Sequence, residues 1–249
     1  MRKLDIIRQK RRFEMFNERS RDKVLELNTF FGKYKMQFED RIKKLFVYYD
    51  TPDKDLEKSN IVLFKTQIGN FCELNMATEK INATYRYQIK TNYKHFTKPI
   101  KMHDNILKHK DFLIESFASM FMSGINFDAE FLMRKLKVAY TIETVSTEFR
   151  SLDVMGLKIT YSFDKDKYTN KFNNQIAFND VLTIYQHSRP ETDADFADLM
   201  SKLMRYCKEL TETTETKIMI ARRKTETSLF PIKEKVDPKK KDKKDKKKK

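Results

Sequence analysis

The sequence lacks tryptophan and is poor in the residues that make turns. Its 249 residues include only four Gly and five Pro, and so few chain-breaking residues predict few, long elements. The two cysteines, Cys72 and Cys207, lie far apart, which argues against a disulfide scaffold and favours a reducing compartment. No apolar run approaches the ~20 residues of a membrane-spanning helix, and the first residues lack the apolar segment of a secretory signal. We therefore expect a soluble, cytoplasmic protein.

Apolar residues are also scarce for a chain of this length. Hydrophobic residues make up 39% and charged residues 35%, with a mean hydropathy of −0.72. A compact globule of this size should bury more apolar mass, whereas each helix of a thin rod buries only a stripe. The composition therefore favours an elongated helical protein.

Positive charge is concentrated in three segments. The net charge is +16, and residues 1–12, 86–110 and 239–249 carry +5, +6 and +7, so that the remainder is slightly acidic. Localised charge of one sign is typical of an electrostatic binding surface.

Apolar residues recur every three or four positions along most of the chain, which predicts amphipathic helices. The first covers residues 13–49 and ends at Thr51-Pro52. The second covers residues 61–121, which at 1.5 Å per residue is roughly 90 Å, with a kink at Pro99. Residues 157–163 alternate with period two and alone would predict a strand. Because no partner strand is evident, we expect the third helix, which starts near Asp128, to continue there or to break irregularly.

These patterns together predict an all-α fold, an elongated antiparallel helical bundle with a long Pro-kinked central helix. We expect a basic N-terminal arm over residues 1–12, a helical domain over 13–227, and a disordered Lys-rich tail over 228–249.

A turn at Gly124 would fold the second and third helices against each other and gather basic residues at one end of the rod. Such a patch would attract an anionic membrane, at roughly 1 kcal/mol per Lys, or another polyanion such as nucleic acid. The residues expected to bind the membrane or anion are Arg86, Lys90, Lys94, Lys98, Lys101, Lys108, Lys110, Arg134, Lys135 and Lys137.

The region from residue 13 to about 120 resembles a BAR (Bin/amphiphysin/Rvs) domain, and most closely the BAR proteins of the ciliary base. The resemblance is carried by Phe30-Phe31-Gly32, by the Phe64 to Phe71 region, and by the stretch from Tyr85 to Lys101, where Pro99 sits in mid-helix. It implies an antiparallel homodimer that senses or bends membranes with a curved basic face, acting as a scaffold near the membrane, the cytoskeleton or the ciliary base.

The sequence shows none of the common catalytic motifs, such as a Gly-rich phosphate loop or a His-Glu-x-x-His helix. The spacings of His95, His103 and His109 do not place ligands at i, i+4. We therefore expect no enzyme activity, no cofactor and no metal site. Two alternatives to a membrane module stay open. One is a structural protein of the cytoskeleton or cilium whose basic patches bind an acidic partner such as tubulin tails. The other, less favoured, is a nucleic-acid-binding protein.

Overall fold

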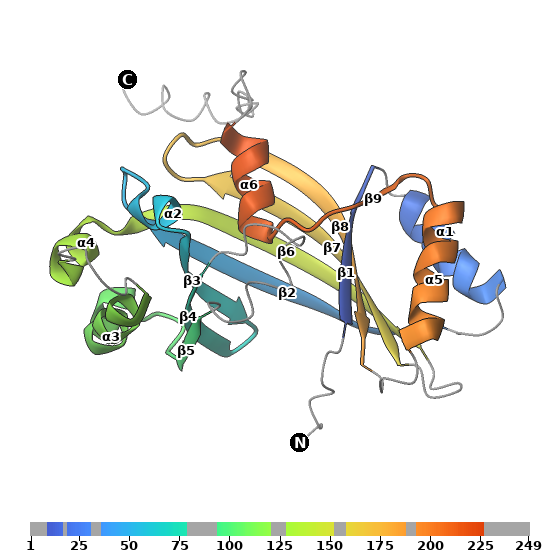
Figure 1. Cartoon of the computed structure of the whole chain (residues 1–249), viewed down its shortest axis with the longest axis horizontal. Helices are drawn as coiled ribbons and strands as arrows, with labels where there is room; N and C mark the ends of the chain where they lie inside the picture. The colour runs from blue at the N-terminus through green and yellow to red at the C-terminus, as the bar shows by residue number, and fades with distance from the viewer. Residues whose placement is uncertain are drawn as a thin grey trace, which may run out of the picture.

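A nine-stranded antiparallel sheet dominates the computed structural model, which describes residues 9–16, 19–30, 36–78, 94–120, 128–151, 158–187 and 193–226. The strands lie in the order β5-β4-β3-β2-β6-β7-β8-β1-β9. Figure 1 shows this sheet crossed by one helix, α6, with further helices at its two ends.

The strands have the following bounds: β1 Gln9–Met15, β2 Met36–Asp50, β3 Ile61–Ile68, β4 Phe71–Thr78, β5 His95–Pro99, β6 Lys137–Ser151, β7 Ile159–Asn170, β8 Ile176–Gln186 and β9 Leu210–Glu212. The helices are α1 Arg19–Phe30, α2 Asp55–Lys58, η3 Ile106–His109 (a 3-10 helix), α3 Lys110–Met120, α4 Ala129–Lys135, α5 Asp193–Tyr206 and α6 Lys217–Glu226.

Two kinds of strand connection build the sheet. Neighbours in sequence such as β3 and β4 form hairpins, and their two-residue turn places Gly69 at φ +55°, a conformation that glycine adopts without a Cβ clash. In contrast, β1 lies between β8 and β9, which are remote from it in sequence. The chain therefore joins its first described strand to its last ones.

The two faces of the sheet are covered differently. We call the face that carries α6 the inner face and the opposite one the outer face. On the outer face, α1 and α5 pack over an apolar cluster that includes Phe13 and Phe163, while α3 and α4 cover a second cluster around Leu63 and Leu74. On the inner face, Ile218 and Ala221 of α6 pack on one end of β6 and β7.

The predicted all-α bundle is wrong. Long strands replace the expected helices, and the period-two stretch belongs to β7, with β6 and β8 as the partner strands that the sequence analysis did not find. The cause is the distribution of polar residues over the two faces of the strands. A strand shows hydrophobic alternation when one face is apolar and the other polar, and β7 does alternate, with Ser162 and Asp164 on the inner face. Strand β2 instead carries lysines on both faces, Lys43 on the outer and Lys44 on the inner one, so its alternation is lost.

The expected central rod over residues 61–121 does not exist. Its described part, residues 61–78 and 94–120, forms β3, β4, β5, η3 and α3, and residues 79–93 lie outside the described residues. Pro99, expected to kink a helix, instead ends β5, which is an edge strand and so tolerates a residue without an N–H donor. The expected turn at Gly124, the first eight residues and the Lys-rich tail also lie outside the described residues.

Within the described ranges, no helix is long and apolar enough to cross a membrane.

The hairpin β3–β4 offers a direct test of strand against helix. In a helix over residues 61–121, Phe71 would share one apolar face with Phe64 and Ile68, yet it is 52% exposed, whereas Leu74 is fully buried. We expect Leu74→Ala to lower the free energy of unfolding by about 2–5 kcal/mol and Phe71→Ala to change it by about 0.5 kcal/mol or less. Urea unfolding followed by circular dichroism measures both, and a larger loss for Phe71→Ala would contradict the sheet.

Candidate functional site

The inner face of the sheet is lined with polar side chains that are nevertheless buried. Directly paired residues of antiparallel strands share a face, so the pairing traces rows across the sheet. Ser146, Ser162 and Thr183 are at most 1% exposed, and Asp164 and Asp166 at most 4%. Three such rows are Glu14–Val181–Asp164–Ser146, Arg12–Thr183–Ser162–Glu148 and Asn179–Asp166–Thr144–Lys44.

Lys217, the first residue of α6, points its ammonium into these rows. Its Nζ lies 3.0 Å from Asp164 Oδ2, and 2.6 and 2.7 Å from the two carboxylate oxygens of Asp166. The Thr144 hydroxyl oxygen lies 3.2 Å away. The Lys217 side chain is 12% exposed and that of Asp166 is fully buried. One ammonium is thus surrounded by four oxygens in the interior of the protein.

Hydroxyl groups occupy most of the remaining lone pairs of the two carboxylates. Ser146 and Ser162 donate to Asp164 Oδ1 at 2.5 and 2.8 Å. Thr144 donates to Asp166 Oδ1 at 2.5 Å, and Tyr168 donates to Asp166 Oδ2 at 3.0 Å. Buried charges persist only when they are paired and hydrogen-bonded in this way. We call the seven residues Thr144, Ser146, Ser162, Asp164, Asp166, Tyr168 and Lys217 the Lys217 cluster.

The surroundings of Asp164 and Tyr168 shift the pKa values of these two residues in opposite directions. Burial opposes ionisation of Asp164, but the charge of Lys217, the hydrogen bond from Ser146 and the charge of Lys44 together keep its pKa below the ordinary value. Burial and the neighbouring Asp166 carboxylate raise the pKa of Tyr168 far above its ordinary value. At neutral pH, Asp164 is therefore an acceptor and Tyr168 a donor.

Other cations reach the inner face from different elements. Lys44 Nζ lies 3.2 Å from Glu148, and both side chains are about four-fifths buried. Lys224 Nζ donates to Asn179 at 2.8 Å and lies 3.6 Å from Glu14. Since each of these two cations already has an acceptor, an anionic ligand would have to exchange partners with it.

Arg12 on β1 keeps part of its donor capacity. Its Nη1 donates to the Glu215 carbonyl at 2.6 Å, while its buried Nε has no hydrogen-bond partner among the described residues. A buried donor without a partner destabilises the fold, so a ligand oxygen that accepts a hydrogen bond from Arg12 Nε would be bound favourably.

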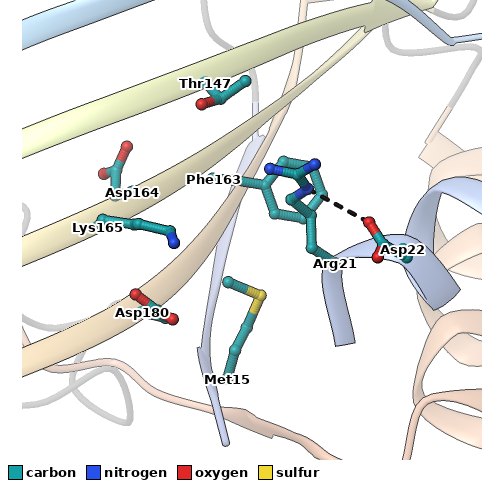
Figure 2. A pocket seen from close by; sticks show the side chains of 8 residues that line it. All are labelled: Met15, Arg21, Asp22, Thr147, Phe163, Asp164, Lys165 and Asp180. Carbon is teal, nitrogen blue, oxygen red and sulfur yellow. Dashed lines mark ion pairs between the residues drawn. The ribbon is translucent and has the colours of Figure 1, made fainter. Parts of the chain in front are cut away.

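A separate cavity of about 170 Å³ lies on the outer side of the sheet, beside α1. Figure 2 shows its lining, in which Arg21 and Asp22 form an ion pair at 3.5 Å. Ligand sites are commonly 300–1,000 Å³, so this cavity is small for a substrate pocket. The residues around it are Met15, Arg21, Asp22, Thr147, Phe163, Asp164, Lys165 and Asp180.

No group of three or more His, Cys, Asp or Glu suited to holding a metal ion occurs in the described part of the chain. The Asp164–Asp166 pair, which would supply hard oxygen ligands for Mg²⁺ or Mn²⁺, is engaged by Lys217 instead.

The basic residues expected to form a binding face lie elsewhere. Arg86 and Lys90 are outside the described residues, Lys98 is on β5, Lys137 begins β6, and Lys101 is exposed in a turn. Lys94 donates to the Ser119 carbonyl.

Four of the other expected residues pair with acids near α3 and α4. Lys108 lies 3.8 Å from Asp104 and Lys135 lies 3.7 Å from Asp53. Lys110 and Arg134 meet on one carboxylate, that of Glu130, at 2.7 and 3.8 Å. None of the ten belongs to the Lys217 cluster. Their role as a membrane- or anion-binding surface, and the expected homodimer and acidic protein partner, stay predictions.

Sequence reasoning missed the Lys217 cluster altogether. The available signal was the alternation around Ser162, Asp164 and Asp166, in which every second residue is polar and short or charged. That pattern indicates a strand with one polar face. Nothing in the local sequence places Lys217, more than 50 positions away, against it.

No known protein family matches the sequence, and no curated protein matches it. Solved structures do. A protein of Pyrococcus horikoshii is 12% identical with a TM-score of 0.44, covering 86% of this chain and 99% of its own. A candidate adenylate cyclase of Bacillus halodurans is 13% identical with a TM-score of 0.47, covering 86% and 96%. A candidate adenylyl cyclase of Hippeastrum, described as having a dominant triphosphatase activity, is 9% identical with a TM-score of 0.48, covering 86% and 94%.

A likeness at this level assigns neither a family nor an activity to this chain. The expectations from sequence are nonetheless corrected. The BAR resemblance and the membrane or cytoskeletal scaffold that it implied are wrong, because the helical rod that carried them is a sheet. The expected absence of enzyme activity is corrected too. It assumed a featureless rod, whereas the chain buries a polar, charged inner face.

The lowered pKa of Asp164 predicts how stability depends on pH. The unfolded chain, with an Asp pKa of 3.8, takes up the proton before the folded chain does as pH falls. The stabilisation is therefore present above the unfolded value and is lost as pH drops from about 4 through the lower folded value. We expect Asp164→Asn to flatten the fall in the free energy of unfolding between pH 5 and about pH 2.5.

Urea titrations at a series of pH values measure this dependence. Asp111→Asn, which changes an exposed carboxylate in the first turn of α3, is the control and should retain the wild-type slope. Equal slopes for wild type and Asp164→Asn would show that Asp164 is not stabilised as an anion.

Proposed function

We propose that the inner face binds a polyphosphate chain, with inorganic triphosphate and nucleoside triphosphates as the substrate class, and hydrolyses it. One observation carries the proposal: the middle of the inner face buries seven polar residues of β6, β7 and β8, with partly buried charged residues of β1, β2 and β6 at the ends of the same rows. The buried ones are Thr144, Ser146, Ser162, Asp164, Asp166, Asn179 and Thr183. Burying such groups costs stability unless each is paired. Apolar side chains would fill the same interior without this cost, so the burial of polar groups here indicates a functional site.

The types of residue fit a phosphate ligand. Arg12, Lys44 and Lys224 supply cations from β1, β2 and α6, which can bind successive phosphate groups. The Nε of Arg12 is ready to donate, because among the described residues it has no partner. Ionised Asp164, held by Ser146 and Ser162, is an acceptor that can orient a water molecule.

The reaction fits this set of groups. Water adds to the terminal phosphorus, the bond to the bridging oxygen breaks, and orthophosphate and the shortened chain leave. Cations stabilise the charge on the departing oxygen, which is the largest catalytic contribution that fixed groups make. The Hippeastrum protein is described as a triphosphatase, but the proposal stands on the lining residues of this chain alone.

Neighbouring lysines on β2 provide a matched test. Lys44 is about four-fifths buried on the inner face, opposite Thr144, while Lys43 is exposed on the outer face, opposite Val145. A hydrogen bond to a charged group contributes about 1.5–3 kcal/mol, so we expect Lys44→Gln to weaken triphosphate binding by at least about tenfold. Lys43→Gln should change it by less than about twofold.

Isothermal titration calorimetry with inorganic triphosphate measures binding, and phosphate release from triphosphate and ATP, with Mg²⁺ and with EDTA, measures turnover. The proposal fails if the wild-type chain neither binds nor cleaves triphosphate or ATP at about 1 mM, or if the two variants lose affinity equally.

A further inference from the structure

The oxygen cage around the Lys217 ammonium resembles the surroundings of a bound cation. Four oxygens from Thr144, Asp164 and Asp166 lie 2.6–3.2 Å from Nζ. Carboxylate and hydroxyl oxygens are the ligands that Mg²⁺ and Ca²⁺ prefer, at about 2.0–2.6 Å. The ammonium group is larger than either metal ion and its contacts with the oxygens are longer. It nevertheless occupies the position between the two carboxylates that a metal ion would take.

A positive charge already occupies the position between the two carboxylates. Asp164 and Asp166 bring two negative charges, and Lys217 supplies one positive charge in direct contact with both. Lys44 carries a further positive charge that contributes to the lowered pKa of Asp164, but it is itself paired with Glu148 at 3.2 Å. A divalent cation added to the intact cluster would be buried in contact with the Lys217 ammonium, where like-charge repulsion and desolvation both oppose it.

The position of Lys217 is fixed by the rest of α6. Arg222 lies 3.3 Å from Glu57, and Lys54 lies 2.8 Å from Glu226 at the end of the helix. Thr225 contacts Asn170 at 3.4 Å, while Ile218 and Ala221 are buried against the sheet. Contacts along the length of α6 thus hold its first residue over Asp164 and Asp166.

We infer that Lys217 is the resident counter-cation of Asp164 and Asp166, so that the inner face of the wild-type chain takes no divalent cation at this pair and gains one when the lysine charge is removed. The inference does not depend on the proposed hydrolysis, because its readout is the binding of a metal ion.

The test compares Mn²⁺ binding to the full chain and its variants by electron paramagnetic resonance and calorimetry. Wild type and Lys217→Arg, which keeps the charge, should bind no Mn²⁺ at this site at 0.1 mM. Lys217→Met, which keeps the length without the charge, should bind one Mn²⁺ per chain. The double variant Lys217→Met with Asp166→Asn should lose that binding by at least about tenfold.

Two uncompensated buried carboxylates can impair folding of Lys217→Met. Refolding is therefore measured in EDTA and in Mn²⁺, and restoration of the fold by Mn²⁺ but not by EDTA supports the inference as binding does. The inference is overturned if wild type binds one Mn²⁺ and Asp166→Asn abolishes it. It is also overturned if Lys217→Met binds no Mn²⁺ when folded, or gains nothing from Mn²⁺ when unfolded.

Discussion

The ion pair network of Lys217 with Asp164 and Asp166 is the constraint on which the inner face depends. Two carboxylates less than 5% exposed cannot remain ionised side by side without a counter-charge. The lysine comes from α6, the last described helix, while both acids come from β7. The same interaction therefore fixes the last described helix on the sheet and helps to hold the pKa of Asp164 below its ordinary value. Loss of the Lys217 charge would therefore affect both the packing of α6 on the sheet and the pKa of Asp164.

Some of the architecture could be predicted from the sequence, and the failure to predict the sheet has a definite physical cause. The alternation near Ile159 did indicate a strand, and the scarcity of apolar residues was real. What misled the helical assignment is that this sheet places its polar groups inside and leaves Phe38 and Phe178 largely exposed outside. Rules that equate buried with apolar then find no strand in β2 or β8, and spacings of three or four residues between aromatics pass for helical stripes. Tertiary context decided between the two periods.

The candidate site was beyond sequence reasoning for a related reason. The predicted binding face lies where lysines are dense, at residues 86–110, but Lys108 and Lys110 of that segment pair with Asp104 and Glu130. The lysine that matters, Lys217, begins α6, a short basic helix that lies outside the three charged segments identified from the sequence. Its significance arises only from the pairing of β6 with β7 and the placement of α6 across them. Charge density and charge placement are different quantities, and only the first is visible in one sequence.

The position of β1 between β8 and β9 has a consequence for how the chain assembles. Phe13 pairs with Leu182 on one side and Glu212 on the other, so the strand made earliest on the ribosome can be completed only by segments made roughly 170 to 200 residues later. Closing loops of this length before any ladder bonds form is entropically unfavourable, and topologies of this kind fold slowly. Until those segments are made, β1 lacks the partners that it has in the fold on both of its edges. Its Lys10, Arg11 and Arg12 are charges of the kind that disfavour pairing of an open strand with a second copy of itself.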